Sequence, residues 1–338
     1  MPTTTPPSQH RLRLYNAALA QAHDLEDPAE ASRYLIRHGL LAVTDYPQLP
    51  AALRPPLAVA SQRNAAANLL RVARYQAIAE ALAGFPFAPL KGIHLLDTVY
   101  RDDPENRVLT DLDLLVRERD TAAVLDRLDA LGYRESAASR RVAAHRHERV
   151  LSDGSLTVEV HTRLGIKHGP RSAWRELAPK PGGQVHGRPC YLLDDDTTLV
   201  HLVTHFVKHG PYTRLAWAED IVRLCEPAGG GIDTGRAVEI ARRLGAERSF
   251  TAGVGALSAL VGKDFLAAVP GRDDDRLLRL HERLVWSHLA TRPLLCGFAS
   301  NAARRNLSAV LLADRPGDAK DFLVSKGVEL KQRWLPGK

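Results

Sequence analysis

The chain has 338 residues, of which 45% are hydrophobic and 25% are charged, an ordinary composition for a globular protein with a substantial core. The formal net charge of +7 is modest. No apolar run approaches the ~20 residues that a membrane-spanning helix requires, and the polar start does not resemble a signal peptide. The three cysteines lie far apart without any Cys-x-x-Cys, which argues against a disulfide framework or structural zinc. We therefore expect a cytoplasmic protein that does not associate with membranes.

Helical patterns occupy the beginning and the end of the chain, and a mixed α/β pattern lies between them. Ala, Arg and Leu are abundant and aromatic residues make up only 6%, which also favours helix over strand. We predict a helical N-terminal region (1–85), a mixed core (86–195) and a helical C-terminal domain (196–338). In chain order the predicted elements are helices at 12–22, 29–39 and 57–82, a strand at 86–90, a helix at 93–100, a strand at 109–116, a helix at 119–131, strands near 147–162, a short strand at 188–193, and further helices from 197 to about 325.

The pair Lys91-Gly92 follows the first predicted strand and precedes the helix at 93–100. A glycine lets backbone amides approach a phosphate closely, and the N-terminus of a helix adds positive potential. The lysine supplies a point charge. This segment therefore favours a phosphate-binding turn.

Asp111 and Asp113 lie in an otherwise apolar run, 109–116. Because residues i and i+2 of a strand point to the same face, both carboxylates project together, while Leu112 and Leu114 point the other way. Two like charges on a half-buried surface are costly unless a cation neutralises them. A pair of divalent metal ions would do so and would clamp the oxygens of a phosphoryl displacement. A solvated strand end is the alternative interpretation of Asp-Leu-Asp taken alone.

A phosphate-binding turn, a spacer helix and a same-face carboxylate pair together resemble the nucleotidyltransferase superfamily that includes DNA polymerase β. In that superfamily a Gly-Ser or Gly-Gly turn precedes Asp-x-Asp or Asp-x-Glu on the next strand, so this chain departs from it at Lys91. The resemblance implies an α+β fold with a small mixed β-sheet, and a third carboxylate on a neighbouring strand. Alternation over 155–162 places Glu159 and His161 on one face, which makes Glu159 the candidate. A surface glutamate on an edge strand is the alternative.

Further ordered motifs narrow the resemblance to the bacterial group called uncharacterised nucleotidyltransferases, over roughly residues 60 to 225. The resemblance implies transfer of a nucleoside monophosphate from an NTP to a hydroxyl or similar nucleophile. It also implies that Asp111, Asp113 and Glu159 are catalytic and hold two Mg²⁺ ions, with Mn²⁺ as a substitute. The motifs are Lys91-Gly92, Arg107-x-x-x-Asp-x-Asp-x-Leu-Val, Gly132-Tyr133, Val158-Glu-Val-His161, Leu199-Val-His-Leu-Val-Thr-His205 and Trp217-Ala-Glu-Asp-Ile.

Several cationic or histidine side chains are candidate contacts of the nucleotide. Lys91, the Gly92 amide and Arg107 would absorb charge on the triphosphate. For Arg107 the alternative is a structural ion pair with a nearby acid. The possible acidic partners of Arg107 are Asp102, Asp103 and Glu105.

Histidines contribute further candidates. His161 shares a face with the third carboxylate, and it either donates to a phosphate, tunes the glutamate or is a satisfied polar neighbour. His201, His205 and His209 recur every four residues on one side of a predicted helix, where a structural role is favoured because no third metal ligand follows. If this helix packs against the sheet, His205, Lys208 or His209 would contact phosphate or base. Asp220 would then either accept a hydrogen bond from one of the histidines or lie in solvent.

Residues 134–175 form a basic belt, with nine Lys or Arg against four Asp or Glu. Such a belt could neutralise a triphosphate, follow a nucleic-acid backbone or form a solvated face. Only Tyr133 and Trp174 bracket it, so it lacks interleaved aromatic side chains on which bases would stack.

We therefore expect the acceptor to be a small molecule or a peptide, as in natural-product tailoring. A tRNA- or protein-modifying, toxin-like transferase is one alternative. A catalytically silent nucleotide-binding module is the other, and the presence of all three carboxylates argues against it.

Overall fold

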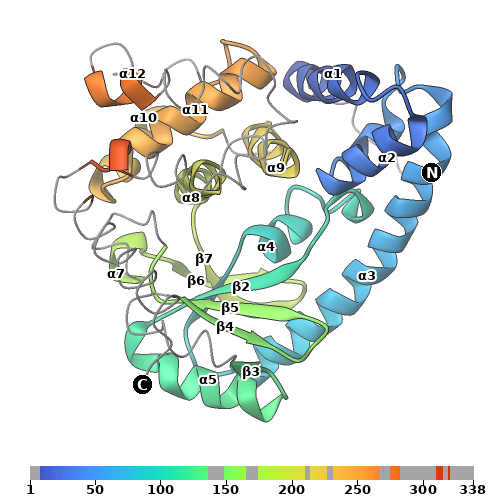
Figure 1. Cartoon of the computed structure of the whole chain (residues 1–338). Coiled ribbons are helices and arrows are strands. Elements are labelled where there is room, and N and C mark those ends of the chain that lie inside the picture. Colours follow the sequence, from blue (N-terminus) through green and yellow to red (C-terminus); the bar gives the residue numbers. More distant parts are fainter. Residues whose placement is uncertain are drawn as a thin grey trace, which may run out of the picture.

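The computed structural model describes residues 8–135, 148–164, 174–209, 214–226, 231–266, 269, 275–281, 310–314 and 319. Within these residues the chain has an α+β fold, in which a small mixed sheet is flanked by helices from both ends of the sequence (Figure 1). The predicted fold class is therefore confirmed. Cys296, much of the belt (136–147 and 165–173) and most of the helical pattern predicted after residue 282 lie outside the described residues.

Five strands form the main sheet in the order β1-β2-β5-β4-β3, and two more form a separate hairpin, β6-β7. Within the main sheet β2 and β5 are parallel, and the other neighbours are antiparallel. This register places Glu159 beside Asp113 on β2, and Leu90 at the end of β1 on its other side. The strands are β1 (Phe87–Leu90), β2 (Asp111–Val116), β3 (Arg134–Glu135), β4 (Glu148–Ser152), β5 (Thr157–His161), β6 (Lys180–Val185) and β7 (Arg188–Leu192).

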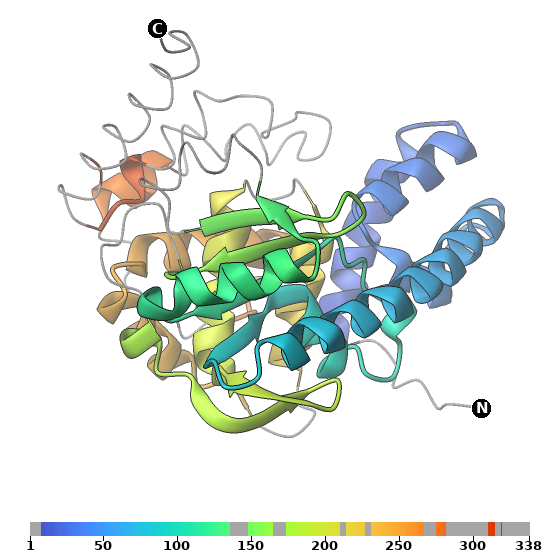
Figure 2. The ribbon, with the colours of Figure 1, turned by 90° about the horizontal axis from the view of Figure 1, so that it is seen from below.

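The two faces of the main sheet differ in chemistry because the side chains of β2 and β5 alternate. Leu112 and Leu114, with Val158 and Val160, join the apolar core beneath the C-terminal half of α3 and α5 (Figure 2). Because side chains alternate along a strand, Asp111, Asp113 and Glu159 lie on the other face of the sheet. Helices α8 and α9 lie above that face (Figure 1). The α-helices are α1 (Gln9–His23), α2 (Pro28–Arg37), α3 (Arg54–Ala81), α4 (Lys91–Asp97), α5 (Thr121–Ala130), α7 (Trp174–Leu177), α8 (Asp195–Lys208), α9 (Ala216–Cys225), α10 (Thr234–Arg243), α11 (Glu247–Val261) and α12 (Arg276–His281).

The N-terminal and C-terminal helices share one apolar core, to which α1, α2 and α8 to α11 all contribute. A polar contact also joins the two groups, because the Tyr15 hydroxyl of α1 donates to the Glu219 carboxylate of α9 at 2.7 Å. The division into three regions at residues 85 and 195 stays a prediction. None of the helices in the described part of the chain is long and apolar enough to cross a membrane.

Several elements differ from the sequence-based expectation, among them β3 and α7, which were not predicted. Strand β6 was not predicted, since Pro181, Gly182 and Gly183 are typical of a turn. Gly183 is needed in this strand because a Cβ there would lie 2.4 Å from Leu192 Cγ of β7. Helix α4 begins at Lys91, so the Lys-Gly pair forms its first turn and does not precede it.

Close packing of α11 against α8 makes Gly253 a sensitive position, since its Cβ would lie 2.4 Å from Val203 Cγ1 and 3.1 Å from the Val203 carbonyl oxygen. Gly253→Ala should therefore lower the free energy of unfolding by about 1–3 kcal/mol, as overpacked cores do. Gly235→Ala on α10 is the matched control, because only Asp233 Oδ1 lies near, at 3.3 Å. Urea denaturation of both variants tests this, and equal stabilities would show that α8 and α11 are not closely packed at this point.

Candidate active site

Asp113 is a buried carboxylate with two cationic neighbours. Its side chain is 2% exposed, and its Oδ1 atom lies 2.7 Å from Lys91 Nζ and 2.8 Å from His161 Nε2. Burial alone would raise the pKa of Asp113, but Lys91 and His161 hold that pKa well below its ordinary value. Both contacts use Oδ1, so Oδ2 can ligate a metal ion without displacing either neighbour.

Lys91 reaches Asp113 because β1 ends directly beside it. Leu90 pairs with Asp113 in the sheet, and the next residue turns into α4. The backbone φ of Lys91 is 46°, in the left-handed region that only a few per cent of non-glycine residues adopt. Burial would lower the pKa of the Lys91 ammonium, but the carboxylate of Asp113 outweighs burial and raises it. Lys91 is therefore positively charged at neutral pH.

Gly92 is closely packed. A Cβ at this position would lie 2.3 Å from Leu109 Cδ1, so a larger residue would force the buried Leu109 side chain to move. The same Cβ would lie 3.6 Å from an Arg107 guanidinium nitrogen. The contact between the Gly92 amide and a phosphate stays a prediction.

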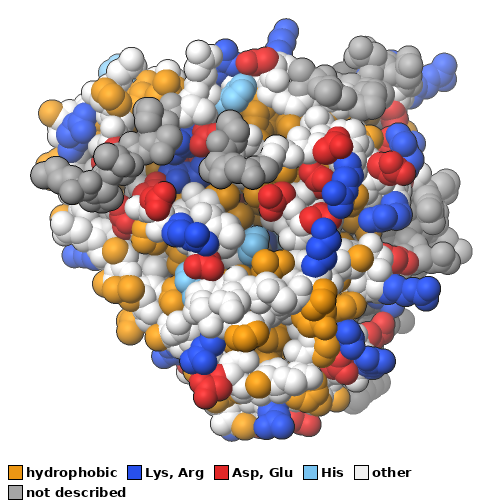
Figure 3. All heavy atoms as spheres, turned by 180° about the vertical axis from the view of Figure 1, so that it is seen from behind, with side chains coloured by type: hydrophobic (Ala, Val, Ile, Leu, Met, Phe, Trp, Pro, Cys, Tyr) orange, Lys and Arg blue, Asp and Glu red, His pale blue; other side chains and the backbone are white. Residues whose placement is uncertain are grey.

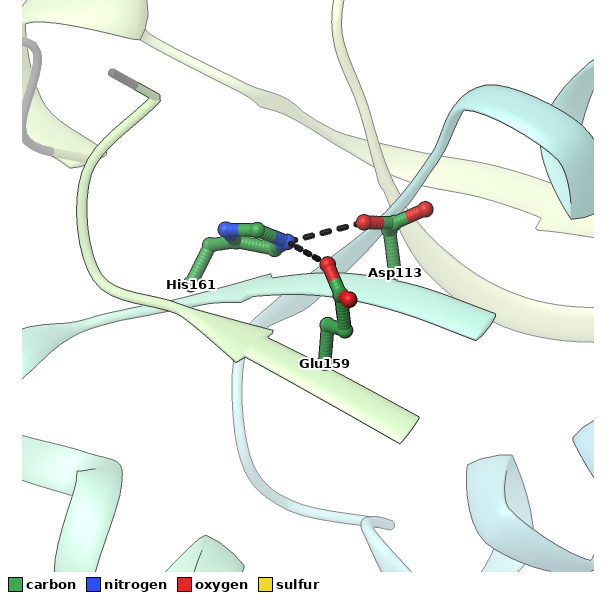
Figure 4. Close-up of side chains that lie close together, drawn as sticks. All are labelled: Asp113, Glu159 and His161. Atoms are coloured by element: carbon green, nitrogen blue, oxygen red, sulfur yellow. Dashed lines mark hydrogen bonds and ion pairs between the residues drawn. The ribbon is translucent and has the colours of Figure 1, made fainter. Parts of the chain in front are cut away.

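Asp113, Glu159 and His161 form a compact group on adjacent strands (Figure 4). The His161 Nε2 atom lies 3.5 Å from Glu159 Oε2, and one ligand atom from each of the three residues lies within 4.8 Å of the others. Although burial alone would lower the pKa of His161, hydrogen bonding to Asp113 and Glu159 raises it. The two carboxylates thus share one imidazole, and the predicted contact of His161 with a nucleotide phosphate stays a prediction.

Asp111 lies two residues before Asp113 on β2. It is half-buried and pairs with Thr157 of β5. Burial and the charge of Asp113 raise the pKa of Asp111. Asp111 and Asp113 are positions i and i+2 of β2, which places them on the same face of the strand. Lys91 and His161 supply positive charge at Asp113, and the role of Asp111 as a metal ligand stays a prediction. Carboxylate oxygens suit Mg²⁺ and Mn²⁺ alike, and a neighbouring imidazole can also ligate a divalent metal ion, so this group of residues fits one.

Arg107 is buried against an acid that the sequence did not single out for it. Its Nε atom lies 2.7 Å from Asp220 Oδ1 on α9, and both side chains are almost fully buried. The Tyr100 hydroxyl donates to the same Asp220 oxygen at 3.0 Å. Of the expected partners, Asp103 pairs instead with Arg223 at 2.7 Å. Both interpretations of Asp220, a partner of a histidine or a solvated residue, were therefore wrong.

Two asparagines on α3 hold the segment that leads into β2. The Asn64 amide donates to the carbonyl oxygens of Glu105 and Arg107, at 2.8 and 2.9 Å. The Asn68 amide donates to those of Pro104 and Arg107, both at 2.8 Å. Neither asparagine was predicted from the sequence to support the site. Asparagines at positions i and i+4 on the apolar side of a long helix were the available signal.

Helix α8 brings the histidine stripe to the acidic face of the sheet. Burial holds the pKa values of His201 and His205 well below normal, so both imidazoles are neutral. The Nε2 atom of His201 is buried without a hydrogen-bond partner. The Trp217 ring lies 5.0 Å from that of His205 and 5.5 Å from that of His209, measured between ring centroids.

Lys208, at the end of α8, completes this side of the site. Its Nζ atom lies 4.0 Å from Glu148 Oε2 on β4, and Glu148 also lies 4.0 Å from His161 Nδ1. The condition stated for Lys208 and the histidines, that their helix packs against the sheet, is thus met. Their contact with a nucleotide stays a prediction.

The match to a known family covers the whole of this arrangement. A sequence model of a family described as uncharacterised nucleotidyltransferase matches residues 18–262. The chain belongs to this family. The match confirms the resemblance and extends it from the predicted 60–225 to include most of the N-terminal helices and α10 and α11. No curated protein and no solved structure matches the chain. The protein is therefore a nucleotidyltransferase, an enzyme whose substrates include an NTP.

The buried histidine of α4, His94, should make the stability of the protein depend on pH. His94 is 7% exposed, and burial lowers its pKa to about 4. In the unfolded chain the pKa of this histidine is about 6.5. At a pH between about 4 and about 6.5, unfolding therefore takes up a proton. The free energy of unfolding consequently decreases as the pH falls from about 6.5 to about 4. His94→Leu should remove this loss, gaining about 3 kcal/mol relative to the parent between pH 7 and pH 4. Urea denaturation at several pH values measures it, and parallel curves would contradict a neutral buried His94.

Proposed function

We propose that this enzyme transfers a nucleoside monophosphate from an NTP to a small molecule or a peptide, with the help of divalent metal ions. The observation that carries the proposal is the grouping of Asp113, Glu159 and His161, with their ligand atoms within 4.8 Å of one another. The acceptor oxygen would form a bond to the α-phosphorus, the bond from that phosphorus to the bridging oxygen would break, and pyrophosphate would leave. The proton of the acceptor hydroxyl would pass to solvent.

Asp111, Asp113 and Glu159 would hold two Mg²⁺ ions, or Mn²⁺ in their place. When bound, such ions stabilise the negative charge of the triphosphate and lower the pKa of an attacking hydroxyl. Lys91 would keep Asp113 ionised and add positive charge beside the phosphates. His161 would orient Glu159, the carboxylate on the strand next to Asp113.

The surface supports a small or peptidic acceptor over RNA. Two basic residues in the described part of the belt have acidic partners, because Arg134 pairs with Asp129 and Arg149 pairs with Glu135. Cations that are paired in this way offer less free charge to a phosphate backbone. On the face shown in Figure 3, Lys and Arg side chains are interspersed with Asp and Glu and do not gather into one basic field.

Labelled nucleotide can decide both the reaction and the acceptor class. Each reaction would contain the protein, Mg²⁺, one α-³²P-labelled NTP and one acceptor fraction. The acceptor fraction would be a metabolite extract, a peptide pool or total tRNA. We expect label in the metabolite or peptide fraction with the parent protein and with Asp126→Asn, an exposed control on α5. Asp113→Asn should reduce incorporation to background. Label in tRNA alone would overturn the proposed acceptor, and parental activity in Asp113→Asn would overturn the site.

The role of Glu159 can be separated from simple binding. As a ligand of the ion that activates the nucleophile, Glu159 should matter more for the chemical step than for NTP affinity. Glu159→Gln should therefore lower kcat roughly 100-fold or more, equivalent to about 3 kcal/mol, while changing the Kd of NTP only a few-fold. Lys91→Ala should instead weaken the binding of NTP more than it lowers kcat. Single-turnover kinetics and separate binding measurements test both, and near-normal turnover in Glu159→Gln would remove it from the metal site.

A further inference from the structure

Helix α3 carries an exposed apolar surface that the active site does not use. In the part of the chain that the structure describes, six large hydrophobic side chains are exposed, and three of them lie on this helix. Leu69 and Leu70 are 73% and 69% exposed, and Val59 lies on the same helix closer to its N-terminus. Single exposed apolar residues are common on protein surfaces, whereas a cluster of them on one element indicates a contact surface.

The exposed apolar residues of α3 lie along one line of the helix surface. Val59, Ala66 and Ala73 follow one another at intervals of seven residues, and Leu70 and Ala77 lie four residues after Ala66 and Ala73. Side chains at this spacing share one side of a helix, as in helices that pair with another helix. We call this set the α3 stripe, and its members, all exposed, are Val59, Ala66, Leu69, Leu70, Ala73 and Ala77.

The opposite side of α3 is packed against the rest of the molecule. Asn64 and Asn68 bind the segment that enters β2. Tyr75 and Ile78 are fully buried in the apolar core under the sheet. Figure 1 shows α3 running along one edge of the molecule. The α3 stripe therefore faces outward from an edge that a partner can approach.

The α3 stripe is complementary to itself when a second copy runs antiparallel to it. A two-fold axis that passes between Leu69 and Leu70 places each of these leucines opposite the other one in the second copy. The same axis places Ala66 opposite Ala73, where the small side chains allow two helices to approach closely. Leucine thus packs against leucine and alanine against alanine, and both copies bury the same surface.

The charges at the two ends of the stripe favour the antiparallel orientation. Arg63 is an exposed cation in its N-terminal part, and Glu80 is an exposed anion just beyond its C-terminal end. A parallel pair would place each Arg63 against its own copy, and such like-charge contacts are unfavourable. The antiparallel pair instead places Arg63 opposite Gln76 and one helical turn from Glu80 of the second copy. Glu80 pairs with Arg188 at 3.3 Å, but its side chain is still 71% exposed and can accept a second cation.

We propose that two copies of this protein associate through their α3 stripes as an antiparallel helix pair. Such an interface closes on itself, because each copy uses its stripe once. From Val59 to Ala77 the stripe is about 28 Å long, at 1.5 Å per residue. A contact of this length lies at the small end of specific interfaces, so the dimer should form at micromolar concentrations. The association does not depend on the proposed reaction, although the same helix holds the segment that enters β2.

Sedimentation velocity at protein concentrations from about 1 to about 100 µM tests the association. We expect a monomer–dimer equilibrium for the parent protein. Leu70→Glu should raise the Kd of the dimer about tenfold or more, because it places two like charges in an apolar contact beside the two-fold axis. Leu280→Glu, at a leucine of α12 that is 41% exposed, is the matched control and should associate as the parent does. A parent that stays monomeric at about 100 µM, or a Leu70→Glu variant with the parental Kd, would overturn the inference.

Disulfide cross-linking tests the orientation of the two helices. Leu70→Cys should form a covalent dimer under mild oxidation, because its two copies lie beside the two-fold axis. Val59→Cys should not, because its two copies are about 30 Å apart in the antiparallel pair. The parent protein, oxidised in the same way, controls for the native cysteines. Absence of the Leu70→Cys cross-link, or an equally strong cross-link through Val59→Cys, would overturn the antiparallel pairing.

Discussion

The buried carboxylate of Asp113 is the constraint on which the arrangement of the site depends. An isolated charge at 2% exposure would cost several kcal/mol, so the fold must bring cations to it. Lys91 arrives because β1 ends beside Asp113, and His161 arrives because β5 runs parallel to β2 with Glu159 in register. The same requirement therefore explains why a lysine begins α4 and why a histidine ends β5. Any metal ion or nucleotide enters a site whose charges are already partly balanced.

A second buried charge cluster connects this sheet to the helical half of the protein. Arg107 pairs with Asp220, Tyr100 donates to Asp220, and Arg223 binds Asp103 while its guanidinium lies 4.2 Å from the centre of the Tyr100 ring. The segment between α4 and β2 is thus fixed by side chains of α9. The geometry of the carboxylates on β2 consequently depends on residues more than a hundred positions later in the chain, and the helices are part of the active-site structure.

Period-two patterns made the central part of the site predictable. Alternation alone placed Asp111 with Asp113 and Glu159 with His161, and the ordered motifs identified the family. The partners of Arg107 and Asp220 were not predictable, because nothing local in either segment encodes a contact across 113 positions, and nearby acids looked equally suitable. Strand β6 was missed for a related reason: Gly183 is dictated by the side chain of Leu192 on its partner strand, whereas its local signal is that of a turn.

The backbone of Lys91 has an evolutionary consequence. Its φ of 46° suits glycine, and a side chain there costs of order 1 kcal/mol. A glycine would relax the backbone and remove the ammonium group from Asp113. At this single position the backbone conformation favours glycine, whereas the charge of Asp113 favours lysine. A lineage that replaced this lysine by glycine would need a cation from elsewhere in the fold to keep its buried aspartate ionised.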